Sequence, residues 1–268
     1  MIDEFPNLAA GGVCAWRLPA DETGPAAART LLHRTMSRLG LGRDVIEDGR
    51  LAVSETATNA LRHARPSTGR PHPPPELWIW ARTAPAPQLV VSVFDHARDV
   101  RPRTSGAGLL DEHGKGLGLL SEFTAGWGSA PSRSRTAGRP VPGKTVWFAL
   151  PLPGDWPGCR LTVSPGTAAQ CLLLAMARRG MDGRRSGDRD GISVVELPGL
   201  NVWVLERHFT WRPQPERFVR RPLVDLQETV EDLVRHFEGS REWPDAAKAP
   251  HKDDLGCWMG PDGPSTPE

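Results

Sequence analysis

The chain of 268 residues contains no tyrosine and only four lysines, and its four cysteines lie far apart without a Cys-x-x-Cys pair. That spacing argues against a zinc site or a disulfide framework, so reduced thiols are expected. No run of about 18 or more apolar residues occurs, which excludes a membrane-spanning helix. The acidic residues 1–5 lack the apolar core of a secretory signal. We therefore expect a cytoplasmic protein without membrane contact.

Arginine supplies nearly all of the positive charge. The 33 basic residues are balanced by 32 acidic ones, giving a formal net charge of +1. Abundant arginine beside scarce lysine, isoleucine and asparagine is typical of a GC-rich genome, so the arginines mainly reflect codon usage. The balanced charge lacks the electrostatic footprint of a nucleic-acid binder. Protein partners are expected, and direct nucleic-acid binding is not.

A helix rich in alanine, leucine and valine carries two polar residues one turn apart. Glu55 and Asn59 are separated by four positions and therefore share a helix face, and Asn59 is one of only three asparagines in the chain. Asparagine is a weak former of helix interiors, which suggests a functional reason for its place. Its amide oxygen suits a hard cation such as Mg²⁺, and Glu55 suits a general base. A solvated helix face is the alternative reading of this pair alone.

Two further segments add to this pattern. Residues 89–95 form an apolar, β-branched run that ends in Asp95, as expected of a buried strand with a carboxylate at its rim. Residues 114–118 read Gly-Lys-Gly-Leu-Gly and open a helical pattern, where exposed backbone N–H groups can approach phosphate oxygens. A simple turn and a plain glycine-rich loop are the respective alternatives.

The order of these motifs, followed by a last strand over residues 144–150, resembles that of the GHKL ATPases. The likeness is closest to the actinomycete anti-sigma factor serine kinases, a soluble branch with a histidine kinase-like ATPase domain, and it covers roughly residues 10–152. Residues 51–60 resemble the N box, residues 114–118 the second glycine-rich box, and residues 143–145 the last nucleotide-box turn. The resemblance implies an α+β two-layer sandwich, with a mixed sheet covered on one face by helices.

The resemblance also assigns roles to individual residues. Asn59 would coordinate Mg²⁺ between the phosphates of ATP, and Glu55 would polarise the attacking hydroxyl as the catalytic residue. Asp95 would hydrogen-bond the amino group of adenine. The remaining cofactor-binding positions would be Gly114, Lys115, Gly116, Leu117, Gly118 and Thr145, with ATP and Mg²⁺ as the cofactors. Lys115 is equally well read as a solvated surface lysine.

The expected reaction is phosphorylation of a serine or threonine on an anti-anti-sigma (STAS) partner. One departure from the family matters, because the segment after Asp95 reads His-Ala-Arg-Asp and has no glycine before Gly106. This motivates an alternative: a non-catalytic, ATP-dependent switch that sequesters a sigma factor or another regulator. A detached two-component kinase module is disfavoured, since no dimerisation helix with a phosphoacceptor histidine precedes Glu55. Members of the family often pair, so the resemblance suggests a homodimer.

Chain length favours more than one domain. We expect an ATP-binding domain over residues 10–152, a linker over 153–165, a small α+β domain over 166–239 and a disordered tail over 240–268. In the small domain, helices near 167–179 and 222–239 enclose strands at 192–197 and 200–207, although the Pro-Gly turn between them leaves that pairing open. Five arginines near Trp211 and Phe218 form either a docking patch for an acidic protein or a solvated face.

Overall fold

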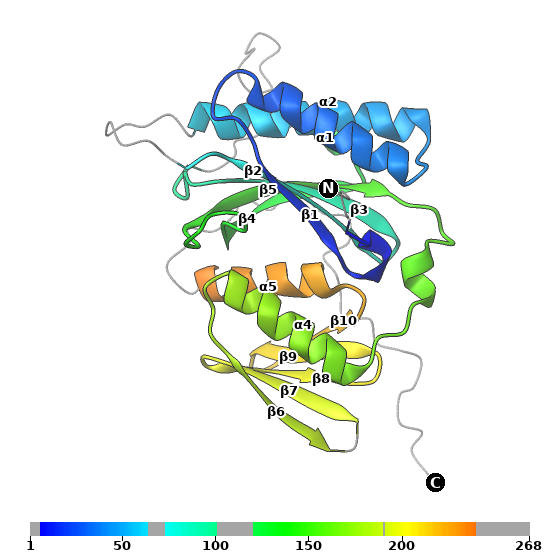
Figure 1. The fold of residues 1–268 in the computed structure, drawn as a ribbon, viewed down its shortest axis with the longest axis vertical. Helices are drawn as coiled ribbons and strands as arrows, with labels where there is room; N and C mark the ends of the chain where they lie inside the picture. The colour runs from blue at the N-terminus through cyan, green and yellow to red at the C-terminus, as the bar shows by residue number, and fades with distance from the viewer. Residues whose placement is uncertain (1–5, 64–72, 101–119, 190, 240–268) are drawn as a thin grey trace.

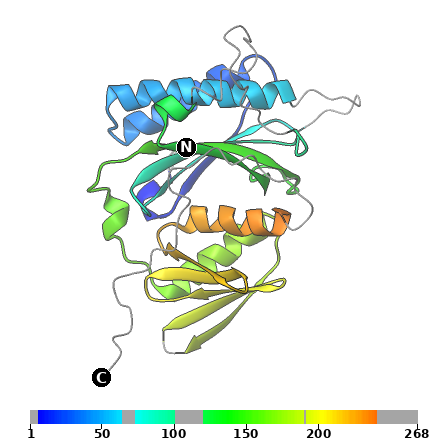
Figure 2. The same cartoon turned by 180° about the vertical axis from the view of Figure 1, so that it is seen from behind.

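The computed structural model describes residues 6–63, 73–100, 120–189 and 191–239. The glycine-rich run at 114–118 and the tail at 240–268 lie outside these ranges. Figures 1 and 2 show stacked layers in the order of a helical layer, a first sheet, a second helical layer and a second sheet. Among the described residues no helix is both long and apolar enough to cross a membrane.

The first sheet, sheet A, has five strands in the order β1-β2-β3-β5-β4. They are β1 (Val13–Arg17), β2 (Glu76–Arg82), β3 (Gln88–Asp95), β4 (Gly126–Arg133) and β5 (Pro142–Pro151). Every pairing is antiparallel, so the expectation of a mixed sheet was wrong in this detail while the α+β architecture is confirmed. The β2–β3 and β4–β5 pairs join consecutive strands, for which antiparallel pairing is favoured, whereas parallel pairs need long crossovers.

One face of sheet A packs against α1 (Gly24–Arg38) and α2 (Arg43–His63). Alternate residues of the central strand, Leu89, Val91 and Val93, enter a core with Leu32 of α1 and Val53 of α2. The helix α1 begins with proline in its first turn and is followed by Gly40 at φ +69°, a backbone conformation that favours glycine. This layer is the predicted two-layer sandwich.

The opposite face of sheet A is also covered, contrary to the expectation that helices lie on one face only. The helix α5 (Leu226–Gly239) packs on β2 and β4, beside α4 (Pro165–Arg178). The side chains of this face include Trp78, Trp80, Val90 and Phe94. The second cover comes from the part of the chain that begins at Pro165 (Figure 1).

The second sheet, sheet B, has five antiparallel strands in the order β10-β9-β8-β7-β6. They are β6 (Arg184–Arg189), β7 (Ile192–Leu197), β8 (Leu200–Val204), β9 (His208–Gln214) and β10 (Arg217–Pro222). Leu197 pairs with Leu200 across Pro198 and Gly199, so the pairing left open by the sequence does form. The arginine-rich segment forms the β9–β10 hairpin, and Trp211 lies in the core rather than in a surface patch.

Candidate functional site

The helix α2 presents Glu55 and Asn59 beside its buried stripe. Ala52, Thr56 and Ala60 are buried against the sheet, while Glu55 and Asn59 are half-buried on the flank of that stripe. Within the described parts of the chain, neither side chain hydrogen-bonds or ion-pairs with another residue. Their polar atoms are therefore available to a ligand without breaking an internal contact.

The packing of α2 sets which end of the sheet these residues approach. A Cβ on Gly49 would lie only 2.9 Å from Leu150 Cδ1, so the first half of α2 sits over the end of β5. Leu150 pairs with Leu89 at the start of β3. Since α2 then packs along β3 and β5, its second half runs toward the other end of β3, where Asp95 lies.

Asp95 faces the same helical layer. It continues the alternation of Val91 and Val93, whose side chains enter the core under α2, and it is buried. Its Oδ1 accepts hydrogen bonds from Lys144 Nζ at 2.6 Å and from the Ala97 backbone N–H at 2.8 Å. Lys144 also donates to the Ala97 carbonyl oxygen at 2.6 Å. The carboxylate at the strand end is thus already held by a buried ammonium group.

Lys144 was not among the predicted site residues, although the alternation of side chains along β5 indicates which face of sheet A it lies on. Val146, Phe148 and Leu150 all belong to the core under α2, so the alternation of the strand puts Lys144 on that face as well. Gly143 allows the close approach, because a Cβ there would lie 2.3 Å from the Asp95 carbonyl oxygen. An adenine amino group at Asp95 would have to share the carboxylate with Lys144.

Thr145, by contrast, is not brought to this site. Its side chain faces the α5 side of sheet A, and its Oγ1 donates to the Ala130 carbonyl oxygen at 3.4 Å. The reason is the two-residue period of the strand, which sends neighbours such as Lys144 and Thr145 to opposite faces. The predicted cofactor-binding residue Thr145 therefore lies on the opposite face of sheet A from Asp95.

The glycine-rich positions Gly114, Lys115, Gly116, Leu117 and Gly118 lie outside the described residues. The helical turn that follows them is described, and Leu120 is buried in the core under α2. Thr124 Oγ1 donates to the Leu120 carbonyl oxygen at 2.5 Å. Leu120 therefore lies on the same face of sheet A as Asp95.

A residue beyond Asp95 connects this end of sheet A to the second helical layer. Arg98 donates to a carboxylate oxygen of Glu238 in α5 and, at 2.6 Å, to the Glu238 carbonyl oxygen. Arg133 of β4 donates to the other carboxylate oxygen at 2.6 Å. Burial tends to raise the pKa of Glu238, but the hydrogen bonds from Arg98 and Arg133 outweigh it and lower that pKa. The segment after Asp95 is thus fixed by ion pairs rather than shaped by glycines.

The residues present accommodate one metal ion only in company with a ligand. The described residues hold no group of three His, Cys, Asp or Glu side chains that could bind a metal by themselves. Asn59 offers a single amide oxygen, which matches Mg²⁺ sites that take one or two protein ligands and complete their shell with phosphates and water. The donor set therefore fits a metal that arrives with a nucleotide.

Comparison with known proteins agrees with this geometry. Residues 18–130 match the family described as histidine kinase-like ATPase domain, a range that includes Glu55, Asn59 and Asp95. A stretch of 48 residues is 46% identical to the serine-protein kinase RsbW of Staphylococcus epidermidis, and the same match is found in two of its strains. That stretch is 18% of this chain and 30% of the relative, so the match spans about a third of the curated relatives' length. The family match is confined to residues 18–130, and over that range the chain is similar to the histidine kinase-like ATPase domains.

Proposed function

We propose that this protein is a Mg·ATP-binding regulator that phosphorylates a serine or threonine of an anti-anti-sigma (STAS) partner. The observation that carries the proposal is the pair Glu55 and Asn59, which lie one helical turn apart on α2. Among the described residues neither side chain has a hydrogen-bond or ion-pair partner. The half of α2 that carries them runs toward the end of sheet A that bears Asp95. The match of residues 18–130 supports nucleotide binding, and the partial likeness to a serine-protein kinase supports the acceptor class.

In this proposal each residue has a defined task. The amide oxygen of Asn59 would hold Mg²⁺, and the Glu55 carboxylate would take the proton of the attacking hydroxyl. The nucleotide supplies the γ-phosphoryl group: an oxygen–phosphorus bond to the acceptor forms, the bond to the β-phosphate oxygen breaks, and ADP leaves. Phosphoryl transfer depends mainly on positioning and charge stabilisation, so Asn59 is expected to matter more than any covalent group.

The proposed nucleotide site comprises Glu55, Asn59, Asp95 and the glycine-rich residues 114–118. Thr145 is left out because its side chain lies on the other face of sheet A, and Lys144 takes its place beside Asp95. We retain residues 10–152 as the ATP-binding domain, 153–165 as its linker and 166–239 as a second α+β domain. We also propose that the protein acts in the cytoplasm as a regulator of transcription and that two copies of it form a dimer.

Calorimetry with Mg·ATP tests the binding step. The unaltered protein should bind, Asn59→Ala should lose binding, and the exposed Asn201→Ala on β8 should behave like the unaltered protein. Equal affinity of the Asn59→Ala variant would contradict the proposed role of Asn59.

Transfer of label from γ-labelled ATP to purified STAS proteins tests the kinase step. Glu55→Gln should keep nucleotide affinity and slow transfer by about 10²- to 10⁴-fold, the usual contribution of a general base. Glu47→Gln on the same helix removes a carboxylate that pairs with Arg50 at the surface, and it should leave the rate unchanged.

A second candidate function is a non-catalytic switch in which bound nucleotide changes the affinity of the protein for a sigma factor. Two contacts favour this function. Lys144 already donates a hydrogen bond to the Asp95 carboxylate, and Arg98, which follows Asp95, is held by an ion pair with Glu238. In that case ATP should change partner affinity while no label is transferred. Sustained transfer of label would exclude a purely non-catalytic role.

A further inference from the structure

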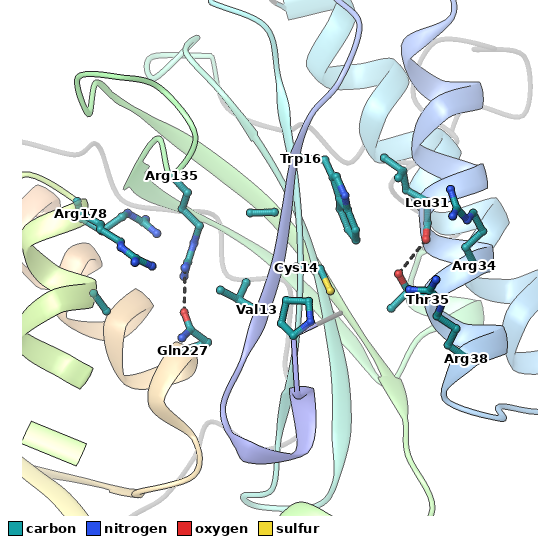
Figure 3. A pocket seen from close by; sticks show the side chains of 14 residues that line it. Val13, Cys14, Trp16, Leu31, Arg34, Thr35, Arg38, Arg135, Arg178 and Gln227 are labelled. Carbon is teal, nitrogen blue, oxygen red and sulfur yellow. Dashed lines mark hydrogen bonds between the residues drawn. The ribbon is translucent and has the colours of Figure 1, made fainter. Parts of the chain in front are cut away.

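A cavity among the described residues lies away from Glu55, along the outer edge of β1. It measures about 400 Å³ and wraps around the strand. Arg34, Thr35 and Arg38 of α1 line one side, whereas Arg135, Arg178 and Gln227 line the other, as Figure 3 shows. A cavity that reaches both faces of an edge strand has the form of a groove for an extended chain.

The backbone of β1 is open toward this groove. Leu18 N–H donates to the Pro75 carbonyl oxygen at 2.7 Å, so Leu18 is in a hydrogen-bonded pair with the chain that precedes β2. Bonded and outward-facing residues alternate in an antiparallel pair, which directs the N–H and C=O groups of Val13, Ala15 and Arg17 to the open edge. The opposite edge strand β4 contains Pro131, a residue that discourages strand addition, whereas β1 contains no proline and no bulge.

The groove is strongly basic. Its lining contains five arginines and, among the described residues, no carboxylate, although the whole chain is nearly neutral. Arg34 and Arg178 are exposed and form no ion pair with any other described residue. Arg135 and Arg179 share the single carboxylate of Glu231, and the Nε atom of each is buried without a hydrogen-bond acceptor. Positive potential is therefore concentrated at the strand edge.

We propose that this groove binds an acidic, extended segment of a partner protein, which adds to sheet A as a strand beside β1. Successive side chains of an added strand point to opposite faces of the sheet. Alternate carboxylates would therefore reach Arg34 on the α1 side and Arg178 on the α4 side. The open backbone groups of Ala15 and its outward-facing neighbours would supply the main-chain hydrogen bonds.

Fluorescence anisotropy with labelled eight-residue peptides tests the proposal on the full chain. A peptide of alternating glutamate and valine should bind and weaken as salt is raised, whereas the lysine–valine counterpart should not bind. Arg178→Glu should weaken binding at least about tenfold, as expected when an attractive contact becomes repulsive. Arg217→Glu, an equal charge change at an exposed position of sheet B, should leave binding unchanged.

Ala15→Pro separates strand addition from simple charge attraction. Proline is tolerated in edge strands where the missing N–H would face solvent, so the fold should persist, as circular dichroism and the melting temperature would show. Binding of the acidic peptide should be lost. Unchanged binding by this folded variant would overturn strand addition. If inorganic phosphate competed with the labelled peptide as well as unlabelled acidic peptide does, the groove would be a site for small anions instead.

Two other occupants are distinguished in the same experiments. Concentration-dependent dimerisation that Arg178→Glu abolishes would assign the groove to a second copy, against the proposal. Peptide binding that appears only after removal of residues 1–5 would assign it to the acidic start of this chain, also against it. Asn59→Ala should bind the peptide normally, so failure of the ATP proposal and failure of this one can be told apart.

Discussion

The two faces of sheet A are buried in different ways. Against α1 and α2 the sheet presents aliphatic side chains such as Val91, Phe148 and Leu150, and Asp95 and Lys144 stand at one end. Against α4 and α5 it presents tryptophans, and charged groups cross the interface. Arg82 pairs with Glu228 at 2.9 Å, and Arg135 and Arg179 each pair with Glu231 at 2.7 Å.

The difference shows how one sheet supports two interfaces. Apolar contacts are non-directional and tolerate small shifts, so they supply most of the stabilisation of the helical layer. Buried ion pairs contribute little net free energy, because desolvation offsets attraction, yet breaking one is costly. Trp78 illustrates the second interface: its Nε1 donates to Glu76, and the guanidinium of Arg179 lies 4.7 Å from its ring centre. That interface therefore combines buried aromatic side chains with directional ion pairs.

Breaking the charged interface should have the largest effect. Glu231→Leu leaves Arg135 and Arg179 buried without their carboxylate, so the free energy of unfolding should fall by about 4 kcal/mol. Arg184→Ala is the control, since its pair with Glu196 is exposed, and it should cost less than about 0.5 kcal/mol. Urea denaturation measures both. Equal losses would show that burial does not distinguish the two ion pairs.

Cavity formation in the aliphatic interface should come next. Leu32 is fully buried between α1 and the sheet, so Leu32→Ala should lower the free energy of unfolding by about 3 kcal/mol. This loss should not vary with pH, because no charge is involved. Leu174→Ala, on the exposed side of α4, should change stability by less than about 0.5 kcal/mol. A loss at Leu32 that follows pH would contradict a purely apolar interface.

Acid should weaken the charged interface selectively, with the smallest effect of the three. Burial tends to raise the pKa of Glu231, but Arg179 and Arg135 outweigh it and lower the pKa from 4.5 to about 2. Because the folded-state pKa is depressed, the stabilisation is present above about pH 4.5 and is lost as the pH falls toward 2. Between pH 5 and pH 3 this group should account for a loss of about 2 kcal/mol.

Glu231→Gln isolates that titration from other groups. The advantage of the unaltered protein over this variant should shrink by the same amount between pH 5 and pH 3, measured by urea denaturation at each pH. Asp225 works in the opposite sense, because burial raises its pKa to about 6 despite the hydrogen bonds from Thr83 and Ala84. A constant difference between the two proteins across this range would refute the depressed pKa of Glu231.

Elements with strong periodicity were correctly predicted, and weakly patterned ones were not. The strands at 89–95 and 144–150 and the helix that carries Glu55 and Asn59 appear where their sequence patterns place them. β4 was missed, because its Gly-Trp-Gly-Ser-Ala-Pro-Ser-Arg sequence is typical of a loop and becomes a strand only by pairing with β5. Sheet B was predicted with two of its five strands for a similar reason.

The sequence alone determined which residues can form the apolar core and which polar side chains could take part in binding or catalysis. The spacing of Glu55 and Asn59 fixes their common helix face, and the alternation of β3 fixes the direction of Asp95, because both follow from local backbone geometry. Tertiary structure alone decided where the polar stripe of α5 lies. Glu228, Glu231 and Glu238 would be solvent-facing on an isolated helix, yet here they are buried against arginines from distant segments. It likewise decided that Lys144 meets Asp95, since a long-range pairing of strands, not local pattern, brings two charges together.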